Sequence, residues 1–191
     1  VDGDADLLCI GEMGIGNTTS ASAIISTVTG ITPAAAAGRG TGVDDKGLSH
    51  KIEVIERVLD FHDIDPENGL QILQKIGGYE LAGIAGAVLA AASKKCAVVL
   101  DGVISTAAGL LAYVINPDVQ GYLISGHKSV EQSQKAALQF MDLEPLIDFD
   151  MRLGEGTGAA LAIDMADAAC KIMCEMASFD QAKVARKKQI S

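Results

Sequence analysis

The chain has 191 residues, of which 49% are hydrophobic, and its formal net charge at pH 7 is −10. This length suits one domain with a sizeable core, and the apolar content excludes an intrinsically disordered chain. The acidic balance disfavours non-specific nucleic-acid binding, which needs clustered Lys and Arg, so we expect no nucleic-acid partner.

The first predicted strand, 7–10, leads into a glycine-rich turn, Gly11-Glu12-Met13-Gly14-Ile15-Gly16-Asn17-Thr18-Thr19, and a small-residue helix over 20–28. A strand, a glycine turn and a helix start form the unit that places backbone N–H groups around a phosphate. Glycine allows a close approach of the backbone, and Asn17 and Thr18 can cap the helix or donate to an anion. Because short glycine motifs also match by chance, an ordinary turn is the alternative.

Residues 30–42 are expected to be irregular and include a second glycine-rich loop, 38–42. The following helix, 48–61, has apolar residues at helical spacing. Lys51 lies in its first turn, where a cation opposes the helix dipole. Lys51 is therefore either an exposed charge or a residue that faces an anion.

Helices and strands alternate through the rest of the chain. Predicted helices cover 65–76, 79–93, 105–115, a segment capped by Ser129 that ends near Met141, and 159–176; predicted strands cover 96–100, 120–124 and 145–149. This alternation predicts an α/β fold with an open, mostly parallel sheet and helices on both faces, in a Rossmann-like three-layer arrangement. We expect the α/β core to cover 1–178 and a basic tail to cover 179–191.

Polar residues follow the ends of the predicted strands. Glu12 follows the first strand, Asp101 the second, residues 125–128 the third, and Glu155 the fourth. Ligands bind beyond the carboxyl ends of strands in such sheets. The four loops are therefore expected to converge on one pocket.

Two of these residues, Glu12 and Glu155, stand in turns between glycines, so their side chains are presented rather than packed. Desolvation would raise their pKa values and suit a general base; solvated loop acids are the alternative. Asp101 can bind a sugar, orient a loop, or cap the helix that starts near 103–105. His127 can act as an acid or base, but is expected to be a solvated or hydrogen-bonded loop residue.

The loops argue against several enzyme classes. Ser125-Gly126-His127 lacks the glycine that precedes the serine in a nucleophile elbow. The opening turn lacks both the Gly-Lys-Ser/Thr ending of an ATP-hydrolysing loop and the full dinucleotide pattern. No His, Cys or Asp cluster has convincing metal spacing, so we expect no metal and no cofactor.

The cysteines and the lengths of the apolar runs indicate the cellular compartment in which we expect the protein. Cys9 and Cys96 lie in strand-like runs, and Cys170 and Cys174 share a helix face without further metal ligands. Free thiols favour a reducing cytoplasm. No signal peptide is visible, and the longest apolar runs are shorter than the ~20 residues that span a bilayer, so we expect no membrane partner. The chain begins with Val1, so a piece of a larger protein is a possibility.

Jointly, these motifs resemble the nicotinate-nucleotide:dimethylbenzimidazole phosphoribosyltransferase family of cobalamin assembly. The resemblance rests on residues 11–19, on 38–42 with Asp44-Asp45 and His50-Lys51, on 77–83, on Asp101-Gly102, and on 153–160. It covers nearly the whole chain and corresponds to the C-terminal half of family members. The N-terminal part, which contributes a small helical domain and part of the base-binding pocket, has no counterpart in these residues.

The resemblance implies transfer of the 5-phosphoribosyl group of nicotinate mononucleotide to 5,6-dimethylbenzimidazole, which gives α-ribazole 5′-phosphate and nicotinate with inversion at the anomeric carbon. By resemblance Glu155 is the general base, and Glu12 lies near the ribose or the reacting centre. The resemblance implies no cofactor and a homodimer. The implied substrate- and phosphate-binding residues are Gly14, Gly16, Asn17, Thr18, Lys51, Asp101 and Gly154. The alternative is a non-catalytic α/β module that binds a nucleotide or phosphate.

Overall fold

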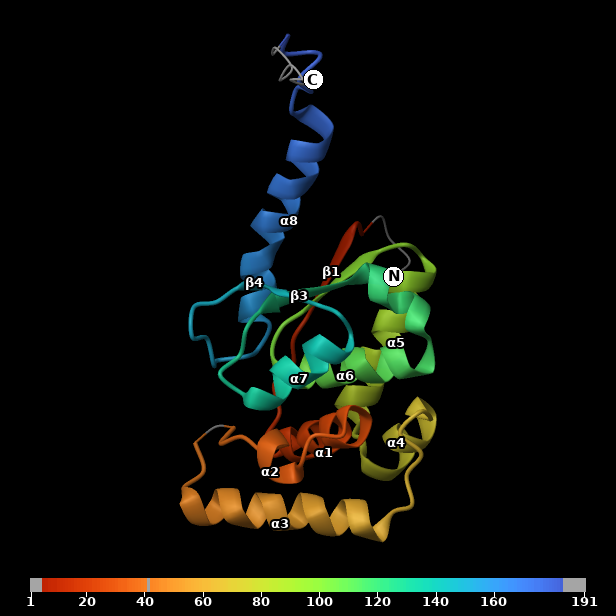
Figure 1. Cartoon of the computed structure of the whole chain (residues 1–191), viewed down its shortest axis with the longest axis vertical. Coiled ribbons are helices and arrows are strands. Elements are labelled where there is room, and N and C mark those ends of the chain that lie inside the picture. Colours follow the sequence, from red (N-terminus) through yellow and green to blue (C-terminus); the bar gives the residue numbers. More distant parts are fainter. Residues whose placement is uncertain (1–4, 41, 184–191) are drawn as a thin grey trace, which may run out of the picture.

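The computed structural model describes residues 5–40 and 42–183 and is built around a parallel sheet (Figure 1). Within these residues the sheet has four strands, β1 (Leu7–Ile10), β2 (Ala97–Leu100), β3 (Leu123–His127) and β4 (Pro145–Ile147). They are hydrogen-bonded in the order β1-β2-β3-β4, and every pair is parallel. The predicted α/β class and parallel sheet are confirmed.

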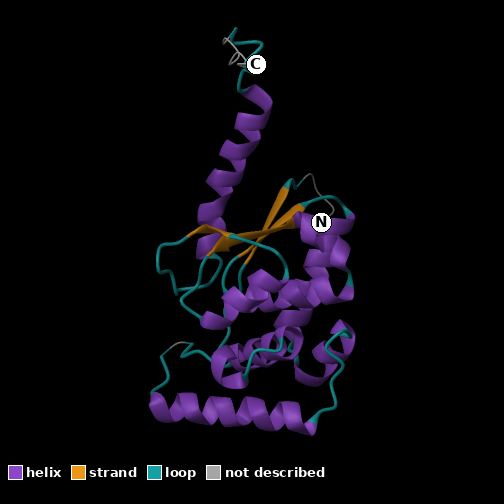
Figure 2. Ribbon diagram, viewed as in Figure 1, coloured by secondary structure: helices purple, strands orange, loops and turns teal. Residues whose placement is uncertain are grey.

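The helices occupy the connections between strands (Figure 2). Between β1 and β2 lie α1 (Asn17–Thr29), α2 (Pro33–Ala36), α3 (Asp45–Phe61), α4 (Gly69–Ile76) and α5 (Tyr79–Ser93). The other helices are α6 (Val103–Ile115), the 3-10 helix η1 (Pro117–Tyr122), α7 (Gln132–Phe140) and α8 (Thr157–Glu175). In Figure 1, α5, α6 and α7 lie under the sheet, α1, α2 and α4 lie below them, and α3 lies at the bottom.

Helices lie on both faces of the sheet, but they cover the faces unequally. On one face, Val98 and Leu100 of β2 join the main core with α5 and α6, and residues 103–112 of α6 are all buried. On the other face, Val99 packs on Ala159 and Ala162 at the start of α8. Because the strand order does not reverse, successive crossovers of one hand return on the same side of the sheet.

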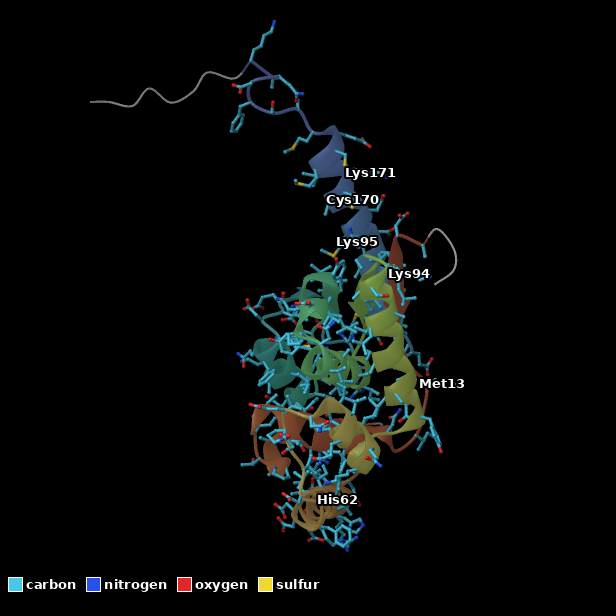
Figure 3. The ribbon with its side chains drawn as sticks, turned by 90° about the vertical axis from the view of Figure 1, so that its right-hand side faces the viewer. Met13, His62, Lys94, Lys95, Cys170 and Lys171 are labelled. Atoms are coloured by element: carbon cyan, nitrogen blue, oxygen red, sulfur yellow. The ribbon has the colours of Figure 1, made fainter. Side chains whose placement is uncertain are left out.

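The outer part of α8 leaves the body of the protein (Figure 1), and Ala162 is the last buried residue of this helix. Cys170 and Lys171 lie on this outer part, far from the sheet (Figure 3). Both Cys170 and Cys174 are exposed, and all four cysteines are free thiols. Within 5–40 and 42–183, no helix has the length and apolar character needed to cross a membrane.

Local chemistry explains where several predicted boundaries shift. Residues 117–122 form η1, so β3 begins at Leu123 rather than at 120 and ends on His127. The segment predicted to be irregular contains α2, because Thr32 caps its first turn and Pro33 suits the first helical position. Ser129 does not cap α7: Glu131 precedes the helix, and Ser129 Oγ instead accepts from the Glu131 N–H.

The predicted limits of the domain and tail remain predictions. Residues 179–183 are exposed and form a turn after α8. Residues 184–191, which carry most of the predicted basic tail, lie outside the described residues, as does Thr41 of the second glycine-rich loop.

Candidate functional site

The loops that follow the four strands meet at one edge of the sheet and enclose a cavity of about 180 Å³. Its walls come from the turn after β1, the start of α6, the β3–α7 loop and the β4–α8 loop. All the predicted site residues except Lys51 line it: Glu12, Gly14, Gly16, Asn17, Thr18, Asp101, Gly154 and Glu155. The sequence-based expectation that the loops converge is therefore confirmed.

The two glutamate loops touch through their backbones. A Cβ atom on Gly11 would lie 2.1 Å from the Gly156 nitrogen and 2.3 Å from its Cα. No side chain fits at such distances, so glycine at position 11 is what allows the turn after β1 to lie against the start of α8. The contact brings residues far apart in the sequence to the same end of the cavity.

Glu12 is half-buried and held by its own loop, because Asn17 Nδ2 donates to Glu12 Oε2. Burial raises the pKa of the Glu12 carboxyl above its ordinary value, and the nearby charges of Glu80, Asp101 and Glu155 raise it further. The Asn17 hydrogen bond opposes this rise in pKa. Acidic groups are therefore concentrated at this end of the cavity. Beside them, Met13 is exposed and projects from the surface near the start of α5 (Figure 3).

Glu155 lies in a left-handed backbone conformation, with φ of 57°. Its neighbours Gly154 and Gly156 are left-handed too, with φ of 76° and 81°. Glycine adopts this region freely, but a glutamate there is strained and persists only when its surroundings hold it. The side chain is exposed at the cavity wall.

Asp101, at the end of β2, is buried and binds the start of α8. Its Oδ2 accepts from the Gly156 N–H at 3.0 Å, and its Oδ1 accepts from Gly158 at 2.6 Å and Ala159 at 3.1 Å. The possibility that Asp101 caps the helix after it is wrong, since Gly102 precedes α6 without a side-chain cap. The carboxylate instead caps α8, a helix that is far from Asp101 in the sequence but next to it in the fold.

His127 also differs from its expected setting. It is the last residue of β3 and only 1% exposed, so the expectation of a solvated loop histidine is wrong. Its Nε2 lies 3.6 Å from Asp101 Oδ1, and neither ring nitrogen has a hydrogen-bond partner within the described residues. Strand β3 lies between β2 and β4, and a parallel strand covered on both faces buries its side chains on either side.

The start of α1, next to Glu12, has features that suit an anion. Helix α1 begins after Gly16, with no side-chain cap and no acidic residue in its first turn. The first N–H groups of a helix lack intrahelical partners and carry a partial positive charge. The predicted order of strand, glycine turn and helix start is thus present, and Gly16, Asn17 and Thr18 at the helix start line the cavity.

Lys51 lies beside this helix start rather than on the wall of the main cavity. Its ammonium donates to Thr18 Oγ1 and to the Gly38 carbonyl, both at 3.0 Å. Burial lowers the pKa of Lys51, and the charge of Glu131 opposes that change. The alternative of a simple exposed charge is therefore wrong. Lys51 lines a second hollow of about 260 Å³, which shares Gly16, Thr18 and Gly40 with the first.

Some lining residues were not singled out from the sequence. Glu131 accepts from the Gly40 N–H at 2.9 Å and so holds the second glycine-rich loop against the cavity. Arg152 and Ser105 line the cavity as well. Their closeness in the sequence to Glu155 and Asp101 was the only signal that could have pointed to them as site residues. Among residues 5–40 and 42–183, no group of three or more His, Cys, Asp or Glu is arranged to hold a metal ion.

Comparison with known proteins gives consistent matches. A family model described as "Phosphoribosyltransferase" matches residues 1–184. The chain is 51% identical over 189 residues to the nicotinate-nucleotide–dimethylbenzimidazole phosphoribosyltransferase of Chloroflexus aggregans; the match covers 99% of this chain and 54% of that protein. It is 51% identical over 187 residues to the protein of the same name from Roseiflexus sp. (strain RS-1), covering 98% of this chain and 53% of that one.

A solved structure is similar along the same stretch. The crystal structure of CobT from Thermus thermophilus matches with a TM-score of 0.90 and 41% sequence identity. This match covers 96% of the present chain and 55% of the solved one. The chain therefore spans about half the length of the relatives that it matches.

Proposed function

The chain belongs to the nicotinate-nucleotide–dimethylbenzimidazole phosphoribosyltransferase family, and on that premise we propose that it carries the catalytic loops for this transfer. The 5-phosphoribosyl group of nicotinate mononucleotide moves to 5,6-dimethylbenzimidazole, which gives α-ribazole 5′-phosphate and nicotinate. The product supplies the lower ligand of cobalamin.

One observation carries the proposal: the cavity is lined by carboxylates and, beside them, by the start of a helix that has no side-chain cap. Glu12, Asp101 and Glu155 line the cavity together with the uncapped start of α1, which lies next to Glu12. Nicotinate mononucleotide carries groups of both charges, because its ring nitrogen is cationic and its phosphate is anionic. Such complementarity orients a charged ligand in a site.

The phosphate is proposed to bind at the start of α1. Gly14 and Gly16 allow the backbone to approach it, and Asn17 and Thr18 contribute N–H groups. Lys51 already donates to Thr18 and Gly38, and an ammonium has three donors, so one donor remains for a phosphate oxygen. Gly154 is proposed to bring the opposite wall close to the ribose.

Glu12 is proposed to stabilise charge at the anomeric carbon. As the bond from C1′ to the nicotinate nitrogen breaks, its electron pair leaves with nicotinate and the sugar acquires oxocarbenium character. Preorganised negative charge beside that carbon stabilises the transition state. Glu12 is fixed for this task by the Asn17 hydrogen bond.

Glu155 is proposed to be the general base. One nitrogen of dimethylbenzimidazole forms the new bond to C1′, and the proton on the other nitrogen passes to the Glu155 carboxylate. The left-handed backbone between Gly154 and Gly156 turns this carboxylate out of the fold and toward the cavity wall. A positioned base contributes about 10²–10⁴-fold to a rate.

We further propose a homodimer in the cytoplasm. Apolar side chains on α8 and just after it are exposed, and such a surface is commonly covered by protein. They are Leu161, Ile163, Met165, Ile172, Met173, Met176 and Phe179. The free thiols are compatible with a reducing compartment. Light scattering of the complete gene product should give twice the mass of one chain; a monomer at all concentrations would contradict the dimer.

The function is tested by product formation. The complete gene product is incubated with nicotinate mononucleotide and dimethylbenzimidazole, and α-ribazole 5′-phosphate is measured by chromatography; the 191-residue chain is assayed in parallel. We expect product from the complete gene product. If calorimetry shows nucleotide binding but no product forms, the result would instead favour the non-catalytic binding module. That alternative is tested because the chain spans only about half the length of its relatives.

A further inference from the structure

The feature that the proposed reaction does not explain is the buried pair formed by Asp101 and His127. Both side chains are at most 3% exposed, and they lie 3.6 Å apart at the ends of neighbouring strands. A buried carboxylate is costly unless hydrogen bonds satisfy it. Here Asp101 receives three of them, and all three come from the four residues that directly follow Glu155.

We propose that Asp101, backed by the His127 ring, is a positioning residue that fixes Glu155 for its reaction by binding the first N–H groups of α8. This role differs from the substrate contact that the sequence suggested for Asp101. The catalytic part of the role rests on the proposed function of Glu155, whereas the geometric part stands independently of it.

The backbone around Glu155 shows why positioning is needed. Three successive residues, Gly154 to Gly156, have left-handed backbones. This conformation is unfavourable for the glutamate among them. Locally the turn is closed by Thr157, whose N–H and hydroxyl both donate to the Gly154 carbonyl. The Asp101 carboxylate supplies the tertiary restraint, because it ties Gly156 and the start of α8 to the end of β2.

His127 packs against the same part of α8 that Asp101 binds. A Cβ atom on Gly158 would lie 1.9 Å from His127 Cδ2 and 2.9 Å from Asp101 Oδ1. The α8 backbone is thus pressed against the ring and the carboxylate together. Both side chains are buried from water, which strengthens the hydrogen bonds of a charged acceptor. Any shift of this pair is expected to move Glu155.

The first test measures geometry without any reaction. Amide hydrogen exchange is compared in wild type and Asp101→Asn, and the protection of Gly156, Gly158 and Ala159 is referenced to the amides of β2. We expect these three amides to lose protection by roughly 10- to 100-fold relative to β2, as for the loss of a hydrogen bond to a charged group. An unchanged ratio would overturn the proposal. Asp167→Asn, which breaks an exposed pair with Lys171 on α8, is the matched control.

The second test separates positioning from substrate contact in the complete gene product. A displacement of about 1 Å at a reacting group can cost roughly 10²-fold in rate, so Asp101→Asn should lower kcat by that order and leave the KM for nicotinate mononucleotide within about twofold. A raised KM at unchanged kcat would overturn the proposal in favour of a nucleotide contact. If wild type makes no product while the exchange result holds, the proposed function fails and the geometric role survives.

A third comparison covers the case in which Asp101→Asn does not fold. Gly158→Ala should lower kcat, because its methyl group collides with His127, and adding His127→Ala should restore part of that loss by removing the ring. Gly86→Ala, on an exposed face of α5 with open space at its Cβ, is the control and should keep wild-type kcat. A double variant no better than Gly158→Ala would overturn the role of the ring.

Discussion

The loops of Glu12 and Glu155 lie against each other at one edge of the sheet, and each presents a glutamate between glycines. Glu12 takes its fixed position from its own segment, through a hydrogen bond from Asn17 in the first turn of α1. Glu155 has a left-handed backbone, and the residues after it are bound by Asp101 from another strand. The Glu12 side chain is thus held by a residue of its own segment, whereas the loop of Glu155 is also held by a residue from another strand.

This difference matches the different needs of the two proposed roles, charge stabilisation and proton transfer. A charge stabiliser such as the proposed Glu12 needs to be near the reacting carbon, and a short-range hydrogen bond is sufficient for that. A general base must meet a proton along a defined direction, so its position has to be fixed more narrowly. The structure places the more extensive restraint on the loop with the proposed base.

The largest expected effect separates the proposed roles of Glu155 and Glu12 in the reaction. Glu155→Gln should lower kcat by about 10²–10⁴-fold with little change in the KM for nicotinate mononucleotide, because only the proton transfer is lost. Glu12→Gln, its matched comparison, should cost less, since an amide keeps the shape and the Asn17 contact. Steady-state kinetics of the complete gene product measure both variants. Equal losses, or a larger loss for Glu12→Gln, would contradict the assignment of roles.

The next effect concerns Lys51, beside the start of α1. Lys51→Met should raise the KM for nicotinate mononucleotide by roughly 10- to 100-fold, the value of a hydrogen bond to a charged group, with a smaller change in kcat. Lys46→Met, an exposed position earlier in the same helix, is the control. A nucleotide KM that is the same in both variants would exclude Lys51 from the phosphate site.

The contact between the two loops is tested through stability. Gly11→Ala places a methyl group onto the Gly156 backbone and should lower the free energy of unfolding by about 1–3 kcal/mol or more. Urea denaturation of the chain measures it. The control is Gly83→Ala, with open space at its Cβ, which should be neutral or stabilising by up to about 1 kcal/mol. Similar stabilities for the two variants would show that the loops are not interlocked.

The smallest expected effect is a pH dependence at Glu12. Because its pKa is raised in the folded state, mainly by burial, ionisation disfavours folding, and stability is lost as the pH rises through the folded-state pKa. Glu12→Gln removes this loss, so the variant should match wild type in acid and exceed it at neutral pH. Water screens this half-buried group, so the gain should stay below about 1 kcal/mol.

Urea denaturation across a pH series checks this prediction. Asn17→Ala, which removes the hydrogen bond that lowers the Glu12 pKa, should enlarge the loss of stability with pH. A Glu12→Gln variant that is less stable than wild type at neutral pH would contradict the direction of the pKa shift.

Much of the fold could be predicted because its signals are local. Helix α5 was predicted at its observed bounds, Tyr79–Ser93, and the first two strands within a residue. Strand β3 was less accurate, since residues 117–122 combine a proline turn with apolar residues that suit a strand equally well. Periodicity cannot separate a short 3-10 helix from the start of a strand.

The sequence by itself determined the parallel α/β class and the convergence of the glutamates, because strand ends and glycine turns follow from local hydrophobicity and backbone freedom. Only the tertiary structure decided that Asp101 binds α8, that His127 is buried, and that Lys51 faces Thr18. Each of these contacts joins residues far apart in the chain. Their partners depend on strand order and on how closely helices approach the sheet, which no local pattern encodes.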